Sequence, residues 1–403
     1  MALKKESIKK FVLIGLSLFL IKSVLILYAY LLDQYTYNAF NQSYYTASLL
    51  ILFGSMGFNI AQTRIPINIF KLLVYVLFNI IIAYFVLHII SAPFDNTIEI
   101  ISVILYSLII SVTGVLNFKL LFEGNYVRYF LILLSLTVVH LLIIPAIQLF
   151  NLSVFFTLSL LVVIWFIIVL KYFDLSFKSN TNVYEYYKIG VSAFIINSAV
   201  SIGLAGDKFI ANHFFDIDLA NTYTFAWSLT APVFYIGTLI EKYLFAEKNP
   251  DKKKILVNGT VISFLLIIAY FVFINSVLWL FPSLLPGAVS KPLFFNLSIF
   301  MMAGYSIYVI FHFPLNTYLF KMLETGKQKI ISIYFAIIIT VFAGVFYYLT
   351  NFNLTIDYKL LLTVVWIYIF ILLITKAIII FSRYPKDKND SDNIISQEFQ
   401  DLP

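Results

Sequence analysis

The sequence predicts an all-α, polytopic membrane protein with about twelve transmembrane helices in two halves of six. Three observations predict it. Hydrophobic residues make up 62% of the 403-residue chain and charged residues only 12%, whereas soluble domains are about 45–50% apolar and about 25% charged. Apolar runs of membrane-spanning length recur along the whole chain, and the basic residues gather in alternate connections between them. A bilayer is the solvent that suits this composition.

The same composition excludes several classes of function. The net charge of +7 comes from residues in short loops between apolar runs, which is typical of topology selection and does not indicate a nucleic-acid partner. The chain has no cysteine, so disulfides and thiolate metal sites are excluded. It also lacks a phosphate-binding glycine loop and an H-E-x-x-H motif. We therefore predict no enzyme activity, no catalytic residues, no cofactor and no metal.

The individual spans follow from the length of a membrane helix. About 20 apolar residues cross a hydrocarbon core of about 30 Å. On that basis the first six spans are predicted at 11–32, 43–62, 67–91, 98–117, 127–149 and 152–171. The second six are predicted at 189–215, 222–242, 255–281, 293–318, 329–350 and 358–382. The hydropathy of the second span is low at its start, where the chain has the polar residues Asn38, Asn41, Gln42 and Ser43. Pro145, Pro232 and Pro314 interrupt three other spans.

The basic residues predict the orientation of these spans. Loops on one side of the membrane hold 22 of the 27 lysines and arginines. Cytoplasmic loops carry such an excess, so both termini are predicted to be cytoplasmic and the number of spans even. The basic N-terminus resembles a signal peptide, but no small-residue cleavage site follows it, so we interpret it as part of an uncleaved first helix.

The longest connection divides the chain into two bundles. We predict an N-terminal bundle at 1–172, a cytoplasmic linker at 173–188, a C-terminal bundle at 189–383 and a disordered cytoplasmic tail at 384–403. A shift of 186 residues aligns the first span with the seventh and Lys22 with Lys208. Identities under this shift are near chance, but both halves begin on the cytoplasmic side. That arrangement suits two halves related by a pseudo-twofold axis along the membrane normal.

Charged groups inside predicted spans are the best functional candidates, because each is costly in hydrocarbon unless it faces a cavity or a partner. Lys22 lies in the middle of the first span. In the seventh span, polar and small residues recur on one helical face: Asn197, Ser201, Ala205, Lys208 and Asn212. Asp207 adjoins Lys208. One interpretation is that both lysines line a central path, and the other is that buried ion pairs hold helices together.

Other polar residues carry weaker signals. Asp216 and Asp218 form a D-x-D at the outer end of the seventh span, which is more typical of an exposed helix end than of a catalytic pair. His140 and His312 lie inside the fifth and tenth spans and are candidates for ion coupling, although a lone membrane histidine is more often a hydrogen-bonded core residue. Arg64 lies at the cytoplasmic end of the second span, where topology and substrate entry both explain it.

Two stretches resemble a known family. The segment from Gly57-Phe58-Asn59 to Thr63-Arg64 is similar to the "G-F-N-x-x-x-T-R" signature of polysaccharide transporters, the O-antigen (Wzx-type) lipid-linked oligosaccharide flippases. Asp207-Lys208-Phe209-Ile210, followed by Thr222-Tyr223 and Pro232, resembles their seventh and eighth spans. The glycine that usually precedes the tyrosine of that second motif is replaced here by Asn221-Thr222.

The resemblance implies a fold and a substrate. The fold is that of the multidrug/oligosaccharidyl-lipid/polysaccharide exporter superfamily, two six-helix bundles forming a V-shaped central cavity. The substrate is an undecaprenyl-diphosphate-linked oligosaccharide (an O-antigen, capsule or exopolysaccharide repeat unit), flipped across the bacterial cytoplasmic (inner) membrane by alternating access. The implied partners are this substrate, membrane lipids, and the polymerase and glycosyltransferases of the same lipopolysaccharide-type pathway. Lys22, Lys208, Asp207, Asn197, Ser201, Asn212 and Arg64 are the implied substrate-binding residues.

Two other functions stay open at this point. A multidrug/cation antiporter of the same superfamily would favour acidic groups inside the first bundle, yet Asp33, Asp95 and Glu99 lie at span edges. A membrane O-antigen polymerase or glycosyltransferase would favour a large outer loop with catalytic residues, which the spans leave no room for.

The predicted orientation can be tested with reporter fusions. Fusions expected to report a cytoplasmic position follow Lys10, Arg64, Lys178, Lys253 and Lys327. Fusions expected to report an external position follow Gln34, Asp95, Asp218, Ala288 and Asn353. The reason is the basic-residue asymmetry, and paired alkaline phosphatase and fluorescent-protein fusions measure it. An inverted result at any loop of the second half would contradict the six-plus-six organisation.

Overall fold

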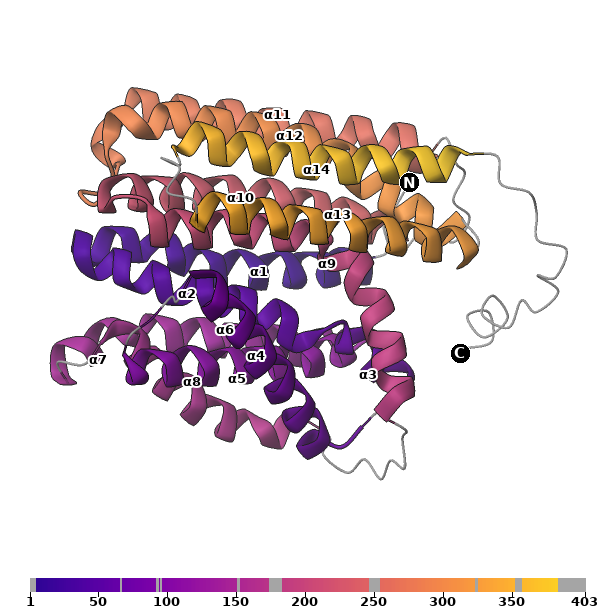
Figure 1. Cartoon of the computed structure of the whole chain (residues 1–403), viewed down its shortest axis with the longest axis horizontal. Coiled ribbons are helices and arrows are strands. Elements are labelled where there is room, and N and C mark those ends of the chain that lie inside the picture. The colour runs from indigo at the N-terminus through magenta and orange to yellow at the C-terminus, as the bar shows by residue number, and fades with distance from the viewer. Residues whose placement is uncertain are drawn as a thin grey trace, which may run out of the picture.

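The computed structural model is a bundle of long helices that run roughly side by side (Figure 1). It describes residues 5–65, 67–91, 94, 96–150, 153–173, 183–245, 254–322, 325–351 and 357–382. Throughout these ranges the regular structure is helical, which confirms the predicted all-α, polytopic fold. The predicted tail at 384–403 lies outside the described residues.

Eight helices form the part of the first half that the structure describes. They are α1 (Lys5–Leu31), α2 (Gln34–Ser55), α3 (Phe58–Arg64), α4 (Ile69–Ser91), α5 (Thr97–Phe122), α6 (Tyr126–Leu141), α7 (Ile143–Phe150) and α8 (Val154–Val169), which a short 3₁₀ turn, η1 (Leu170–Tyr172), extends. With α3 as a continuation of α2 and α7 as a continuation of α6, they correspond to the six predicted spans.

Six long helices make up the described residues of the second half. They are α9 (Val183–Phe214), α10 (Ile217–Phe245), α11 (Gly259–Leu280), α12 (Lys291–Met322), α13 (Thr325–Asn351) and α14 (Tyr358–Phe381). A π-helical turn, η2 (Lys254–Asn258), leads into α11, and a 3₁₀ turn, η3 (Pro282–Leu284), follows it. The predicted linker is thus helical from Val183 onward, because Tyr186 and Tyr187 pack on Phe58 and extend α9.

The two halves share one packing pattern. In the first half α2 packs on α5 and on α4, α1 on α6, α5 on α8, and α6 on α8. The matching helices of the second half make the same pairs: α10 on α12 and on α11, α9 on α13, α12 on α14, and α13 on α14. The halves meet mainly where α1, α2 and α3 contact α9 and α10. In Figure 1, α9 crosses obliquely from α3 toward α10.

The helices at this meeting point are more polar than those around them. By length and composition, eight helical segments of the described chain are apolar enough to cross a membrane, and they belong to α4, α5, α6–α7, α8, α11, α12, α13 and α14. Polar residues can be placed on α2, α9 and α10 because these helices face each other as well as lipid.

The second predicted span begins nine residues too late. Helix α2 starts at Gln34, where the carboxylate of Asp33 accepts hydrogen bonds from the backbone N–H groups of Tyr35 (3.0 Å) and Thr36 (3.1 Å). A further hydrogen bond from the Thr36 hydroxyl lowers the pKa of Asp33. The polar residues near this start make hydrogen bonds within the protein. Gln42 Nε2 donates to Asn212 O (2.7 Å), and the Ser43 hydroxyl donates to Glu99 (3.1 Å).

A glycine separates α2 from α3. Met56 and Gly57 have φ values of 36° and 71°, the left-handed conformation that glycine adopts at little cost. A Cβ on Gly57 would lie 2.0 Å from the carbonyl oxygen of Gly190 in α9. The two backbones therefore touch here, at the start of the G-F-N motif.

Of the three prolines, one marks a break. Pro145 lies in the first turn of α7, after the interruption at Leu142, where it deprives the backbone of one hydrogen-bond donor. Pro232 and Pro314 lie inside the continuous helices α10 and α12.

We expect Gly57→Ala to destabilise the protein, because alanine is strained at this φ and its methyl group collides with Gly190. The expected cost is about 1–3 kcal/mol, seen as a lower midpoint of thermal unfolding in detergent. Gly114→Ala is the matched control, since a Cβ there meets nothing within 4 Å and alanine favours a helix. An equal effect of both substitutions would contradict the close contact.

Candidate functional site

A buried ion pair lies in the C-terminal half of α9. Lys208 Nζ is 2.6 Å from Asp207 Oδ1, and the two side chains are 1% and 0% exposed. Burying two charges is costly, so a pair at this depth needs further hydrogen bonds to be stable.

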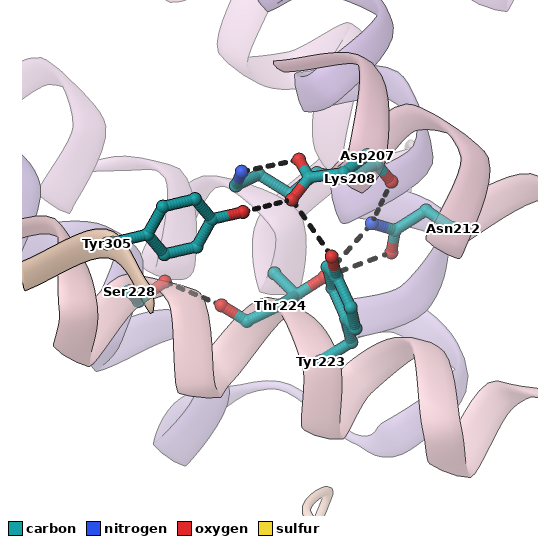
Figure 2. A network of polar contacts seen from close by, with 7 residues as sticks. All are labelled: Asp207, Lys208, Asn212, Tyr223, Thr224, Ser228 and Tyr305. Carbon is teal, nitrogen blue, oxygen red and sulfur yellow. Dashed lines mark hydrogen bonds and ion pairs between the residues drawn. The ribbon is translucent and has the colours of Figure 1, made fainter. Parts of the chain in front are cut away.

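Asp207 receives those hydrogen bonds from two other helices. Its second oxygen, Oδ2, accepts from the hydroxyl of Tyr223 in α10 and from that of Tyr305 in α12, each at 2.9 Å. Figure 2 shows the carboxylate between Lys208 and the two tyrosines. One carboxylate thus joins α9, α10 and α12.

The ammonium of Lys208 also has an aromatic partner. Its Nζ lies 3.4 Å from the centroid of the Trp227 ring, where the negative face of the ring attracts a cation. The neighbouring carboxylate and the indole thus cover the ammonium, which is the arrangement expected if an ion pair holds helices together. An anionic ligand could reach Lys208 only after these contacts rearrange.

Asn212 extends the network toward the first half of the chain. Its Nδ2 donates to Lys208 O (2.8 Å) and lies 3.0 Å from Thr224 Oγ1 (Figure 2). Ser228 in turn donates to Thr224 O (3.0 Å). The carbonyl of Asn212 accepts the hydrogen bond from Gln42 of α2, so the network reaches the interface between the halves.

Of the other residues singled out on α9 and at the start of α10, those whose side chains the structure describes lie apart from this network. Ser201 is exposed on α9, so the polar stripe does not share one environment along its length, because α9 crosses between the two halves. The side chains of Lys22, Arg64 and Asn197 lie outside the described residues. Asp216 caps the start of α10, accepting from Leu219 N (2.8 Å), and Asp218 bonds Gln34.

His140 is a hydrogen-bonded core residue of the first half. Its Nδ1 lies 2.8 Å from the carbonyl oxygen of Leu136 and its Nε2 lies 3.0 Å from the hydroxyl of Tyr106. Both ring nitrogens are therefore engaged. A role in ion coupling gains no support from this geometry.

His312 has a partner that the sequence analysis missed. Lys376 in α14 is completely buried, and its Nζ lies 3.4 Å from His312 Nδ1 and 3.0 Å from Asn316 Oδ1. Its presence within the twelfth predicted span was a usable signal, because lysine inside a span is rare. Among the described side chains, no three histidine, aspartate or glutamate residues gather as metal ligands would.

Comparison with known proteins finds one similar structure. No protein family model matches the chain, and no match was found among curated proteins. The similar solved structure is described as "Outward-facing conformation of a multidrug resistance MATE family transporter of the MOP superfamily", with 17% identity over 92% of this chain and 91% of that chain, and a TM-score of 0.49.

Breaking the buried pair is expected to destabilise the protein strongly. Asp207→Asn leaves an ammonium without its carboxylate, and Lys208→Met leaves a carboxylate without its ammonium, each at a cost of about 3–5 kcal/mol. The double variant should recover much of that loss. Thermal unfolding and membrane abundance measure this, with Lys291→Met, at an exposed position, as the control. Additive losses in the double variant would contradict the pairing.

Proposed function

We propose that the protein is a transporter that works by alternating access and carries a lipid-linked oligosaccharide across the membrane. The observation that carries the proposal is the position of the polar residues. Those of α2, α9 and α10 gather where the two halves meet. Polar groups placed between membrane bundles, and not on their lipid faces, are typical of a solute path.

The two halves also have the construction that alternating access needs. They repeat one packing pattern, and they meet mainly where α1, α2 and α3 contact α9 and α10. Two similar bodies that meet along one set of helices can rock against each other as units, exposing their shared interface to one side and then to the other.

The substrate class is proposed from the two motif regions. Both lie where helices touch: Gly57 contacts α9 at the interface of the halves, and Asp207-Lys208 forms the buried pair. Their resemblance to polysaccharide flippases, together with cations at the pseudo-equivalent positions Lys22 and Lys208, favours an anionic diphosphate carrier. In this proposal Lys208 exchanges Asp207 for the diphosphate during transport. A multidrug/cation antiporter is the second candidate, favoured by the buried Asp207.

The proposal is tested by reconstituting the purified protein in liposomes with an undecaprenyl-diphosphate-linked oligosaccharide. We expect translocation that Lys22→Ala reduces, that Lys22→Glu reduces further because it repels the diphosphate, and that Lys22→Arg partly restores. Translocation is measured as the fraction of the glycan that an added, external glycosidase can cleave.

Lys359→Ala controls for the loss of a positive charge, since Lys359 is exposed at the start of α14. Wild-type translocation by Lys22→Glu at equal protein level would contradict the role of Lys22. Export of cationic dyes without any glycan translocation would favour the antiporter.

A further inference from the structure

Hydrogen bonds join the two halves near the first residues of α2 and α10. The side-chain amide of Gln34 donates to the carboxylate of Asp218, and Asn221 Nδ2 donates to Gln34 O (3.0 Å). From the end of α1, the hydroxyl of Tyr30 donates to Leu284 O of η3 (2.7 Å). The basic residues predict that this end of the bundle is external. We call these contacts, with the deeper ones described next, the outer seal.

A second layer of contacts lies deeper in the outer seal. Gln42, about two turns along α2 from Gln34, donates to Asn212 O near the end of α9 (2.7 Å). The next residue of α9, His213, packs edge to face with Phe94 of the α4–α5 connection, with 6.1 Å between the ring centroids. The seal thus joins α1, α2 and the α4–α5 connection to α9, α10 and η3.

The outer seal buries polar atoms that have no hydrogen-bond partner in the part of the chain that the structure describes. They are Asn38 Oδ1, His213 Nε2 and Asn221 Oδ1. Asn38 lies between Gln34 and Gln42 on the same face of α2. A buried polar atom without a partner has lost its hydrogen bond to water and gained none in return. Closing the seal is therefore costly at three positions.

A second contact between the halves has the opposite character. Where α3 and α4 meet the first turns of α9, Tyr186 donates to Gln62 Oε1 (3.1 Å) and Tyr187 donates to Asn79 Oδ1 (3.0 Å). The amide nitrogens of Gln62 and Asn79 each donate to a backbone carbonyl at 3.2 Å. Both amide groups are thus bonded through oxygen and nitrogen. We call this contact the inner joint.

The two contacts differ in what their separation costs. Separation of the inner joint would break bonds that satisfy two buried amide groups, at the full cost of leaving them without partners until water arrives. Separation of the outer seal would let water reach three atoms that now have no partner. The bond between Gln34 and Asp218 is also easily exchanged for water, because Asp218 is exposed.

We propose that the outer seal is the gate that opens when the two halves move, while the inner joint stays closed and serves as the pivot. Hydration of the three unpartnered atoms favours the opening. The joint involves α3, α4 and α9, so α1 and α2 can part from α10 while it holds. The proposal rests on the proposed function in one respect, the movement of the two halves relative to each other.

Cross-linking tests the two roles, because the chain has no cysteine and introduced pairs react selectively. Gln34→Cys with Asp218→Cys places a pair across the outer seal. Tyr75→Cys with Tyr187→Cys places one across the inner joint, where the two half-buried rings lie 5.7 Å apart. In liposomes that contain the lipid-linked oligosaccharide, a short, reductant-cleavable thiol cross-linker should abolish translocation at the seal, and reductant should restore it. The same cross-linker at the joint should leave translocation unchanged.

Each variant before cross-linking is its own control for the substitutions. Undiminished translocation through a cross-linked outer seal overturns the proposal, and so does loss of translocation when the inner joint is cross-linked. If the wild-type protein carries no glycan, the flippase proposal fails, and spin labels decide the gate on their own.

Distances between spin labels test the gate without a substrate. Labels on cysteines at Tyr35 and Phe214 report on the outer seal, and labels at Phe70 and Lys188 report on the inner joint. All four positions are exposed, so the contacts of the seal and the joint are kept. By pulsed electron paramagnetic resonance of the protein in lipid nanodiscs, we expect two distances across the seal and one across the joint. Two distances across the joint overturn the proposal.

A substitution in the seal should change the balance of the two distances. Asp218→Ala removes the partner of Gln34 and should raise the ratio of open to closed seal about two- to tenfold, as expected for one lost hydrogen bond. Glu185→Ala is the matched control, since Glu185 and Asp218 both lie in the first turn of their helices and Glu185 is at the opposite end of α9 from the seal. A single distance across the seal in wild type and Asp218→Ala, or an equal shift in both variants, overturns the proposal.

Discussion

The carboxylate of Asp207 has more structural consequences than any other single group described here. It accepts from Lys208, Tyr223 and Tyr305, and these donors belong to three helices of the second bundle. In water such bonds would contribute little, because each donor would exchange a water partner for the carboxylate. In a bilayer no water competes, so the geometry of α9, α10 and α12 is fixed by the requirement that one buried charge keep all its partners.

The same requirement accounts for the layout of the rest of the chain. Helices that contact lipid around the periphery, such as α11 and α13, can be almost wholly apolar along their spans. Helices that carry Asn, Gln, Asp or Lys have to be placed against other helices, and α2, α9 and α10 are found at the meeting of the two halves. The polarity of each helix thus decides where it lies in the bundle. Because the polar helices lie between the two halves, the candidate transport path lies there too.

Much of this could be predicted from the sequence because bilayer thickness gives apolar runs a fixed length. The all-α class and the spans followed from that length, and Lys208 beside Asp207 could be interpreted as a pair because adjacent residues on a helix lie close together. The partners from other helices could not be predicted. Tyr305 is almost a hundred residues from Asp207, and nothing local to Tyr305 distinguishes it from the other tyrosines. For Lys376 the place inside a predicted span was a signal in itself, but its contacts with His312 and Asn316 could not be predicted, since these residues lie sixty or more positions earlier. The predicted start of the second span is nine residues too late because a hydropathy criterion counts polar residues against a span. In α2 these polar residues face other helices and not lipid.

The contact between Gly57 and Gly190 has a mechanical consequence. Most helices pack by setting the side-chain ridges of one into the grooves of the other, which resists sliding and rotation. At Gly57 and Gly190 two backbones touch directly, and beside them the ring of Phe58 packs against Tyr186 and Tyr187 of α9. The glycines thus set how closely α3 and α9 approach, and the aromatic rings around them resist sliding. A rearrangement of the two halves that keeps this contact leaves the rings packed, whereas one that opens it must expose them.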